Sequence, residues 1–115
     1  MCCNLPAAGR PPIAITNDGD VVTAKLVGDF DMQTTFTVEP ALERALETRG
    51  LRRIELNLRG LEFIDSTGMG VIVRLDREAR GRGVQLRLRR GPRPVHRVFE
   101  KSGLADALPF SSPDR

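Results

Sequence analysis

The sequence contains no tryptophan, no tyrosine and only five phenylalanines among its 115 residues. Its hydrophobic core must therefore be built mainly from aliphatic side chains. The shortage of aromatic rings also argues against a protein that binds single-stranded nucleic acid by stacking bases on aromatic side chains. A chain of this length is long enough for one domain with a modest core and too short for two.

Cysteine and histidine are also scarce. Cys2 and Cys3 are adjacent and have no cysteine partner elsewhere, which excludes a disulfide framework and fits reduced thiols in a cytoplasm. Together with His96, the only histidine, they make no recognisable zinc site. We therefore expect no metal, no cofactor and a cytoplasmic location.

The sequence has no apolar run that approaches the length of a membrane span. Residues 1–12 also lack the charged start and apolar centre of a signal peptide, and their three prolines and one glycine indicate a flexible lead-in. Residues 109–115 are expected to form a C-terminal tail. We expect no membrane partner.

Charge is unevenly distributed along the chain, although the net charge of +3 is mild. Ten acidic and six basic residues lie between Ile13 and Asp65, whereas nine arginines and only two acidic residues lie between Arg74 and Arg97. Such a basic half is able to attract nucleic acid or an acidic partner. A solvated arginine-rich surface is the simpler interpretation, so we expect no direct contact with nucleic acid.

Four runs of the sequence have the pattern of short strands. Residues 13–16 and 21–27 are rich in β-branched side chains, and the Asp18-Gly19 pair between them is a hairpin signal. Apolar residues alternate with polar ones over 54–58 and again over 84–88. These runs predict a hairpin followed by two more strands.

Three stretches have the periodicity of helices. Apolar stripes run through 38–46 and 68–79, and Pro94 opens a last helix that ends at Gly103. Pro40 is awkward within the first stripe, because it lacks an N–H and clashes with the preceding turn. Either the helix begins near Glu39, or residues 34–39 form a separate, looser turn; the sequence leaves both open.

The predicted order is therefore β-β-α-β-α-β-α. Helical crossovers imply parallel pairing of the later strands, while the hairpin is antiparallel. We expect a single α/β domain over residues 13–108, with a four-stranded mixed sheet packed with helices.

The segment Phe63-Ile64-Asp65-Ser66-Thr67-Gly68-Met69-Gly70 lies between a predicted strand and a predicted helix. Partners of open α/β sheets tend to bind beyond the carboxyl ends of strands, and Asp, Ser and Thr are good helix caps. The spacing fits neither an aspartic protease, a nucleophile elbow nor a phosphate-binding Walker loop. A structural helix start remains an alternative, and catalysis is poorly supported.

At this segment the sequence resembles the STAS domains, and in particular the bacterial anti-sigma factor antagonists. Four stretches carry the resemblance, and together they extend over roughly residues 13–108: Leu26 to Asp31, Ile54 to Leu58, Phe63 to Val71 and Arg97 to Leu104. Departures from the family pattern are Met69, where Leu is more usual, and Pro40 in the first helix.

The resemblance implies a protein-binding switch that is not an enzyme. It implies that Ser66 is phosphorylated by a partner that is both serine kinase and anti-sigma factor, that the unphosphorylated form binds this partner and frees a sigma factor, and that a PP2C-type phosphatase reverses the modification. We expect the partner to contact a surface formed by Asp29, Asp31, Asp65, Ser66, Thr67, Gly68 and Met69.

Two alternatives stay open beside this switch. One is a non-switching STAS scaffold or a soluble subunit of a stressosome or a lipid transport system, and the other is nucleic-acid binding through the arginines between Arg74 and Arg97. We expect a monomer or a weak dimer.

Overall fold

The computed structural model describes residues 11–111, so residues 1–10, which include Cys2 and Cys3, and residues 112–115 lie outside the description. Its elements confirm the predicted order β-β-α-β-α-β-α. They are β1 (Ile13–Asp18), β2 (Val21–Phe30), α1 (Thr35–Leu46), β3 (Arg53–Ile64), α2 (Ser66–Gly81), β4 (Gln85–Arg89) and α3 (Arg93–Lys101). Within residues 11–111, no helix is both long and apolar enough to cross a bilayer.

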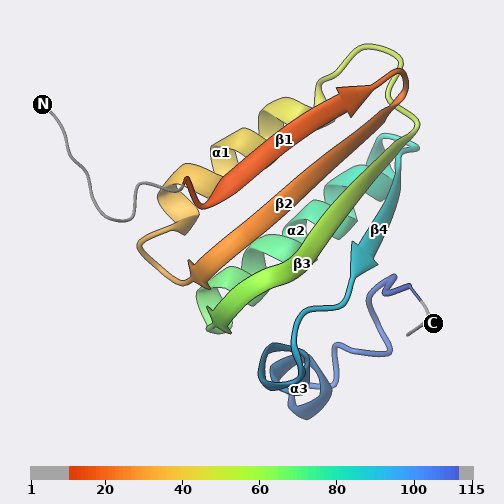
Figure 1. The fold of residues 1–115 in the computed structure, drawn as a ribbon. Helices are drawn as coiled ribbons and strands as arrows, with labels where there is room; N and C mark the ends of the chain where they lie inside the picture. The colour runs from red at the N-terminus through yellow and green to blue at the C-terminus, as the bar shows by residue number, and fades with distance from the viewer. Residues whose placement is uncertain (1–10, 112–115) are drawn as a thin grey trace, which may run out of the picture.

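The four strands form one mixed sheet in the order β1-β2-β3-β4, as Figure 1 shows. The hairpin of β1 and β2 is antiparallel, and β3 pairs in parallel with both β2 and β4. Gly19 has a φ of 65° at the first position of the two-residue turn, a conformation that glycine adopts without strain. The predicted hairpin and mixed sheet are confirmed.

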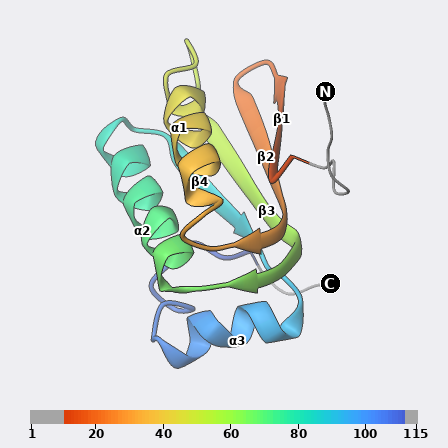
Figure 2. The same ribbon diagram turned by 90° about the vertical axis from the view of Figure 1, so that its left-hand side faces the viewer.

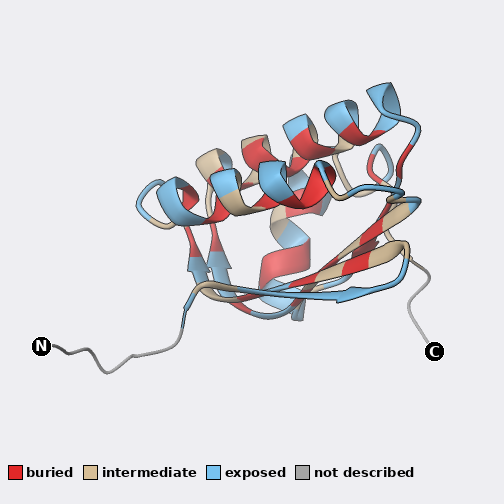
Figure 3. Ribbon diagram, turned by 90° about the horizontal axis from the view of Figure 1, so that it is seen from above, coloured by how far each residue is buried: buried red, intermediate tan, exposed pale blue. Residues whose placement is uncertain are grey.

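Helices α1 and α2 lie side by side on one face of the sheet, and α3 lies near its lower end in the view of Figure 2. Their buried residues face the sheet, whereas their outer faces are exposed (Figure 3). Leu42 of α1 and Ile72 of α2 pack in the same core as Leu56 of β3. Of the hydrophobic residues buried within 11–111, only Phe30 and Phe99 are aromatic, so the expected aliphatic core is confirmed.

Strands β2 and β3 are longer than the alternation of the sequence predicted. The strand predicted to end at Val27 runs to Phe30, and the strand predicted over 54–58 runs on to Ile64. The pairing of β2 with β3 shifts register between Lys25 and Val27 and again between Gly28 and Asp29. Such irregularities break the two-residue period that sequence patterns detect.

Pro40 lies inside α1, which begins at Thr35, so neither of the two expected arrangements is correct. The proline is exposed, on the face of the helix that points away from the core. Water can therefore solvate the carbonyl that its missing N–H leaves without a partner, and its ring displaces no core side chain.

Residues 109–111, part of the expected C-terminal tail, are hydrogen-bonded to β4. The N–H of Leu88 donates to the carbonyl of Pro109 at 3.0 Å, and the N–H of Ser111 donates to the carbonyl of Leu88 at 2.8 Å. Residues 109–111 thus pair with the edge of β4 that lies opposite β3. Phe110 packs against the core in the process.

Candidate functional site

The site lies where β2 and β3 end together. Phe30 pairs with Ile64 at the last step of the parallel ladder, and both side chains are buried. The chain therefore leaves the sheet at Asp31 and at Asp65 on neighbouring strands. This register, which the sequence does not reveal, brings together two segments more than thirty residues apart.

Asp65 forms the N-cap of α2, as its residue type suggested. Its backbone is extended, with φ −116° and ψ −175°, and its Oδ1 accepts a hydrogen bond from the N–H of Gly68 at 3.0 Å. Ser66 follows as the first helical residue and is exposed, while Thr67 is half-buried. The hydroxyl-bearing side chain at position 66 is thus presented to solvent at a helix N-terminus.

Gly68 sets how closely α2 approaches β2. A Cβ atom at this position would lie 2.5 Å from the carbonyl oxygen of Phe30 and 3.0 Å from its Cγ. Gly68 is buried, and the expectation that it contacts a partner stays a prediction. Its role is to let the Ser66 turn pack directly on Phe30.

Asp31 organises the turn between β2 and α1. Its Oδ1 accepts hydrogen bonds from the N–H groups of Gln33 at 3.1 Å and Thr34 at 3.0 Å, and from the Thr34 hydroxyl at 3.2 Å. The backbone hydrogen bond from Thr34 is the main reason that the pKa of Asp31 lies below its usual value. The carboxylate is therefore ionised at neutral pH and fixed in place.

Asp29 adds a third carboxylate to the same edge of the sheet. It is exposed and pairs with Phe63 across the β2–β3 ladder, two residues from Asp31. Its backbone carbonyl accepts a hydrogen bond from the Thr34 hydroxyl at 2.8 Å. Asp31 and Asp65 line one depression, while Asp29 lies further back on the β2–β3 ladder; that the three form one partner-binding surface stays a prediction.

An apolar surface lies beside these carboxylates, and sequence reasoning missed it. Met32, Phe36 and Phe63 are exposed by 64%, 79% and 49%. With Asp31, Gln33 and Asp65 they line a broad, open depression of about 530 Å³. We call Met32, Phe36 and Phe63 the apolar patch. A signal was present in the sequence, because Phe36 lies off the buried stripe of α1, on a face that should be polar.

Met69 does not line the depression of the apolar patch. It is half-buried against the core, and its Sδ accepts a hydrogen bond from the hydroxyl of Ser102, just after α3, at 3.8 Å. The structure therefore does not bring Met69 together with Asp29 and Asp31. Its packing links α2 to the end of α3.

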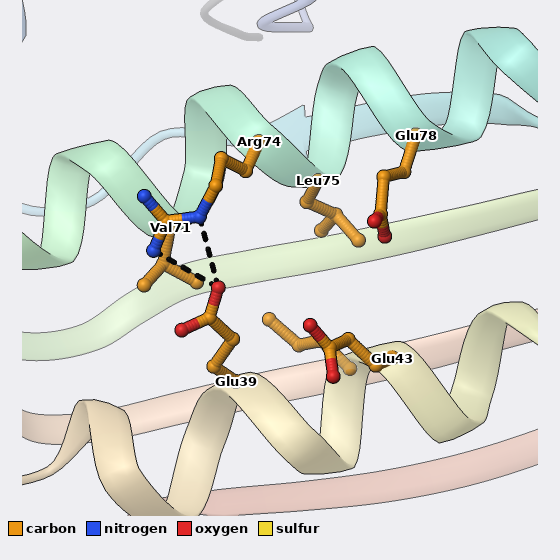
Figure 4. Close-up of a pocket in the computed structure, with 7 residues that line it drawn as sticks. Glu39, Glu43, Val71, Arg74, Leu75 and Glu78 are labelled. Carbon is orange, nitrogen blue, oxygen red and sulfur yellow. Dashed lines mark hydrogen bonds and ion pairs between the residues drawn. The ribbon is translucent and has the colours of Figure 1, made fainter.

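An ion pair holds the two sheet-covering helices together. The guanidinium of Arg74 on α2 contacts Oε2 of Glu39 on α1 through Nη2 at 2.9 Å and Nε at 3.0 Å (Figure 4). Both side chains are partly exposed. Such a pair adds modestly to the shared core that packs α1, which carries Phe36, beside α2, which carries Ser66.

The arrangement has the features of a binding surface. Among residues 11–111, no three His, Cys, Asp or Glu side chains come close enough together to hold a metal ion. His96 lies on α3 and lines neither the patch nor the Ser66 turn. What the site offers is an exposed hydroxyl, three carboxylates and an apolar patch.

Residues 12–113 match the family described as the STAS domain. The chain belongs to the STAS domain family. A curated relative, the anti-sigma F factor antagonist of Paenibacillus polymyxa, is 32% identical over 90 residues, which cover 78% of this chain and 77% of the relative. The resemblance drawn from the four sequence stretches is thereby confirmed.

Solved STAS structures share the fold. The anti-sigma factor antagonist SpoIIAA in its unphosphorylated form superposes with a TM-score of 0.73 at 22% identity, covering 88% of this chain and 89% of SpoIIAA. The phosphorylated form of this Bacillus protein gives a TM-score of 0.67 at 20% identity, covering 88% and 92%. At these identities the likeness establishes the α/β fold.

Proposed function

We propose that this STAS protein is a cytoplasmic anti-sigma factor antagonist that works by binding and is switched by phosphorylation of Ser66. In its unphosphorylated form it binds an anti-sigma factor that is also a serine kinase, and so releases a sigma factor. A PP2C-type phosphatase restores the binding form. The observation that carries the proposal is the exposed Ser66 at the start of α2, directly after Asp65, which lines the depression of the apolar patch.

The position of Ser66 supports a switch that acts at the interface and leaves the fold intact. A phosphate on the first residue of α2 gains from the partial positive charge of the helix N-terminus. Ser66 is exposed, so the phosphate meets water and displaces no core atom. Phosphorylation should therefore leave the stability of the domain nearly unchanged.

The surroundings of Ser66 explain why the phosphate would expel a partner. Phosphorylation adds about −1.5 to −2 charges to a surface that already carries the acidic residues Asp31 and Asp65. A partner surface matched to a neutral hydroxyl then meets bulk and unpaired charge. Each loss of about 1.4 kcal/mol weakens binding tenfold, so a few kcal/mol suffice for a switch.

The apolar patch supplies the affinity that the switch modulates. Large exposed apolar side chains at the centre of an interface commonly dominate its binding energy. Phe36 lies on α1 and Phe63 on β3, so two elements contribute to the patch. The Glu39–Arg74 ion pair contributes to the position of α1. We propose that the partner covers the apolar patch and the Ser66 turn together.

The first experiment maps the phosphorylated residue. The protein is incubated with ATP and purified anti-sigma factor kinases from its source genome, and the label is located by mass spectrometry. We expect label on Ser66, none in Ser66→Ala, and normal labelling in Ser102→Ala, which removes another exposed serine hydroxyl. Label on other residues with none on Ser66 contradicts the proposal.

The second experiment measures binding of the same kinases by calorimetry. Phe36→Ala should weaken binding by tenfold or more, because Phe36 is largely exposed and is available to a partner. Ile15→Ala is the matched control, since Ile15 is an exposed apolar side chain on β1, away from the site. Equal losses for the two variants would exclude the apolar patch as the docking surface.

A further inference from the structure

A second candidate site lies beyond the carboxyl end of β4, at the start of α3. Arg90, Gly91, Arg93, His96, Arg97 and Glu100 line an open, largely polar depression of about 500 Å³. None of these residues belongs to the Ser66 site. Ligands of parallel α/β sheets characteristically bind at this edge, outside the carboxyl ends of the strands.

The three arginines of this depression are not neutralised by the protein. Arg90, Arg93 and Arg97 are exposed, and none of them forms an ion pair with another residue of the described part of the chain. By contrast, Arg74 and Arg80 on α2 are paired with Glu39 and Asp76. Three guanidinium groups around one depression create a strongly positive local potential.

The backbone adds to this potential. The N-terminus of α3 has no side-chain cap, because Pro92 occupies the N-cap position. Its unsatisfied N–H groups carry the partial positive charge of the helix. A Cβ at Gly91 would lie 2.9 Å from the carbonyl oxygen of Leu58, so the loop before α3 is packed tightly on β3 and the helix start is rigidly placed.

His96 forms part of the wall of this depression. This residue of the depression is only 6% exposed, and its Nδ1 has no hydrogen-bond partner. Its ring packs edge-on against Phe110, at a centroid distance of 4.8 Å, and its Nε2 lies 4.0 Å from Oε2 of Glu100. Because Nδ1 is closed off from solvent, only the other side of the ring can sense what occupies the depression, and His96 serves as a reporter of the site.

We propose that Arg90, Arg93 and Arg97, at the uncapped start of α3, form a binding site for the phosphate group of a small ligand, with His96 in the wall of the site. Guanidinium forks match the geometry of phosphate oxygens and bind them with charge-assisted hydrogen bonds. The helix N-terminus contributes in the same sense. This site is separate from Ser66 and does not depend on the proposed switch.

Glu100 and His96 complete the site as a charge-compensating pair. Burial, and then the charge of Arg90, lower the pKa of His96, against the smaller opposite effect of Glu100. The imidazole is therefore neutral at pH 7 when no anion is bound. A phosphate among Arg90, Arg93 and Arg97 offsets their charge and so favours the protonated imidazole, which then interacts with Glu100.

The chain contains a single histidine, which makes the test direct. The imidazole resonances of His96 are followed by NMR in tag-free protein at constant ionic strength while sodium chloride is replaced by inorganic phosphate, and in a second series by glycerol 3-phosphate. We expect a saturable shift of the resonances and a rise in the pKa of His96. If both glycerol 3-phosphate and inorganic phosphate give a saturable shift, the ligand is a phosphorylated metabolite. If only inorganic phosphate does so, the ligand is inorganic phosphate.

Variants distinguish a built site from general attraction to a basic surface. Arg93→Gln and Arg97→Gln should each weaken phosphate binding about tenfold, the effect of losing a hydrogen bond to a charged group. Arg77→Gln, which removes an exposed arginine of α2 that forms no ion pair within residues 11–111, should leave binding unchanged. Shifts that are equal in chloride and phosphate, or an equal loss in Arg77→Gln, overturn the proposal.

Discussion

At the scale of single residues, two glycines of one helix have different reasons to be glycine. Gly68 faces β2, and a Cβ there would come within 2.5 Å of the Phe30 carbonyl oxygen. Gly70 lies two residues on, where the nearest atom to such a Cβ would be Nη1 of Arg74, at an ordinary 3.7 Å. The first glycine is required by packing, and the second is not.

The two alanine variants should therefore change stability in opposite directions. Gly68→Ala should lower the free energy of unfolding by about 1–3 kcal/mol, because the added methyl group overpacks the contact with Phe30. Gly70→Ala should raise it by about 0.5–1 kcal/mol, because alanine loses less backbone entropy in a helix. Urea unfolding of both variants measures the difference. Similar effects of the two substitutions would show that Gly68 does not set the approach of α2.

At the scale of the elements, α1 forms although it contains Pro40, a residue that disfavours a helix interior. Five of its residues are buried (Thr35, Val38, Leu42, Ala45 and Leu46), and this burial against the sheet and α2 outweighs the unfavourable Pro40. Arg44 in the last turn also suits the helix dipole. Tertiary packing thus decides where this helix begins, and local propensity does not.

Replacing Pro40 should strengthen α1. Pro40→Ala restores an N–H donor and removes the ring from the helix, an effect that outweighs the added freedom of the unfolded chain, so we expect a stabilisation of about 1–2 kcal/mol. Glu43→Ala, an exposed substitution in the same helix, is the control and should change stability by less than about 0.5 kcal/mol. Thermal and urea unfolding test the comparison. If Pro40→Ala lowered the free energy of unfolding, the proline ring would be making a stabilising contact.

At the scale of the whole molecule, two titrating groups make the fold sensitive to acid. The pKa of Asp31 lies below its ordinary 3.8, chiefly through the backbone hydrogen bond from Thr34, and the pKa of His96 lies below its ordinary 6.5, chiefly through burial. In both cases the folded protein binds protons less readily than the unfolded chain. The stabilisation that each group contributes to the free energy of unfolding is therefore complete above its ordinary pKa. This stabilisation is lost as the pH falls through the lower pKa of the folded state.

The free energy of unfolding should consequently decline in two stages as the pH is lowered. The first stage begins near pH 6.5 and belongs to His96, and the second begins near pH 3.8 and belongs to Asp31. His96→Leu should flatten the first stage and leave the second, while Asp31→Asn should have the opposite effect. Urea unfolding across the pH range measures both. A first stage that persists in His96→Leu would assign it to another group.

Sequence patterns determined most of the architecture, because hydrophobic periodicity records which face of each element is buried. The alternation of Val22, Ala24 and Leu26 predicted a strand, and the stripe through Val71, Ile72 and Leu75 predicted a helix. The hairpin glycine and the residue that caps α2 were also legible, since turns and caps depend on residues close in sequence. Ser66 was singled out by the resemblance of its segment to the anti-sigma factor antagonists.

Other features of the site depended on contacts between segments distant in the chain. The shifted register of β2 against β3 brought Asp31 beside Asp65, and it lengthened both strands beyond their periodic portions. The apolar patch, the burial of Gly68 and the unpaired Nδ1 of His96 likewise follow from how elements pack. A one-dimensional pattern states which residues avoid water on each element, whereas only the packed sheet and helices decide which of them meet, and which large apolar side chains remain exposed.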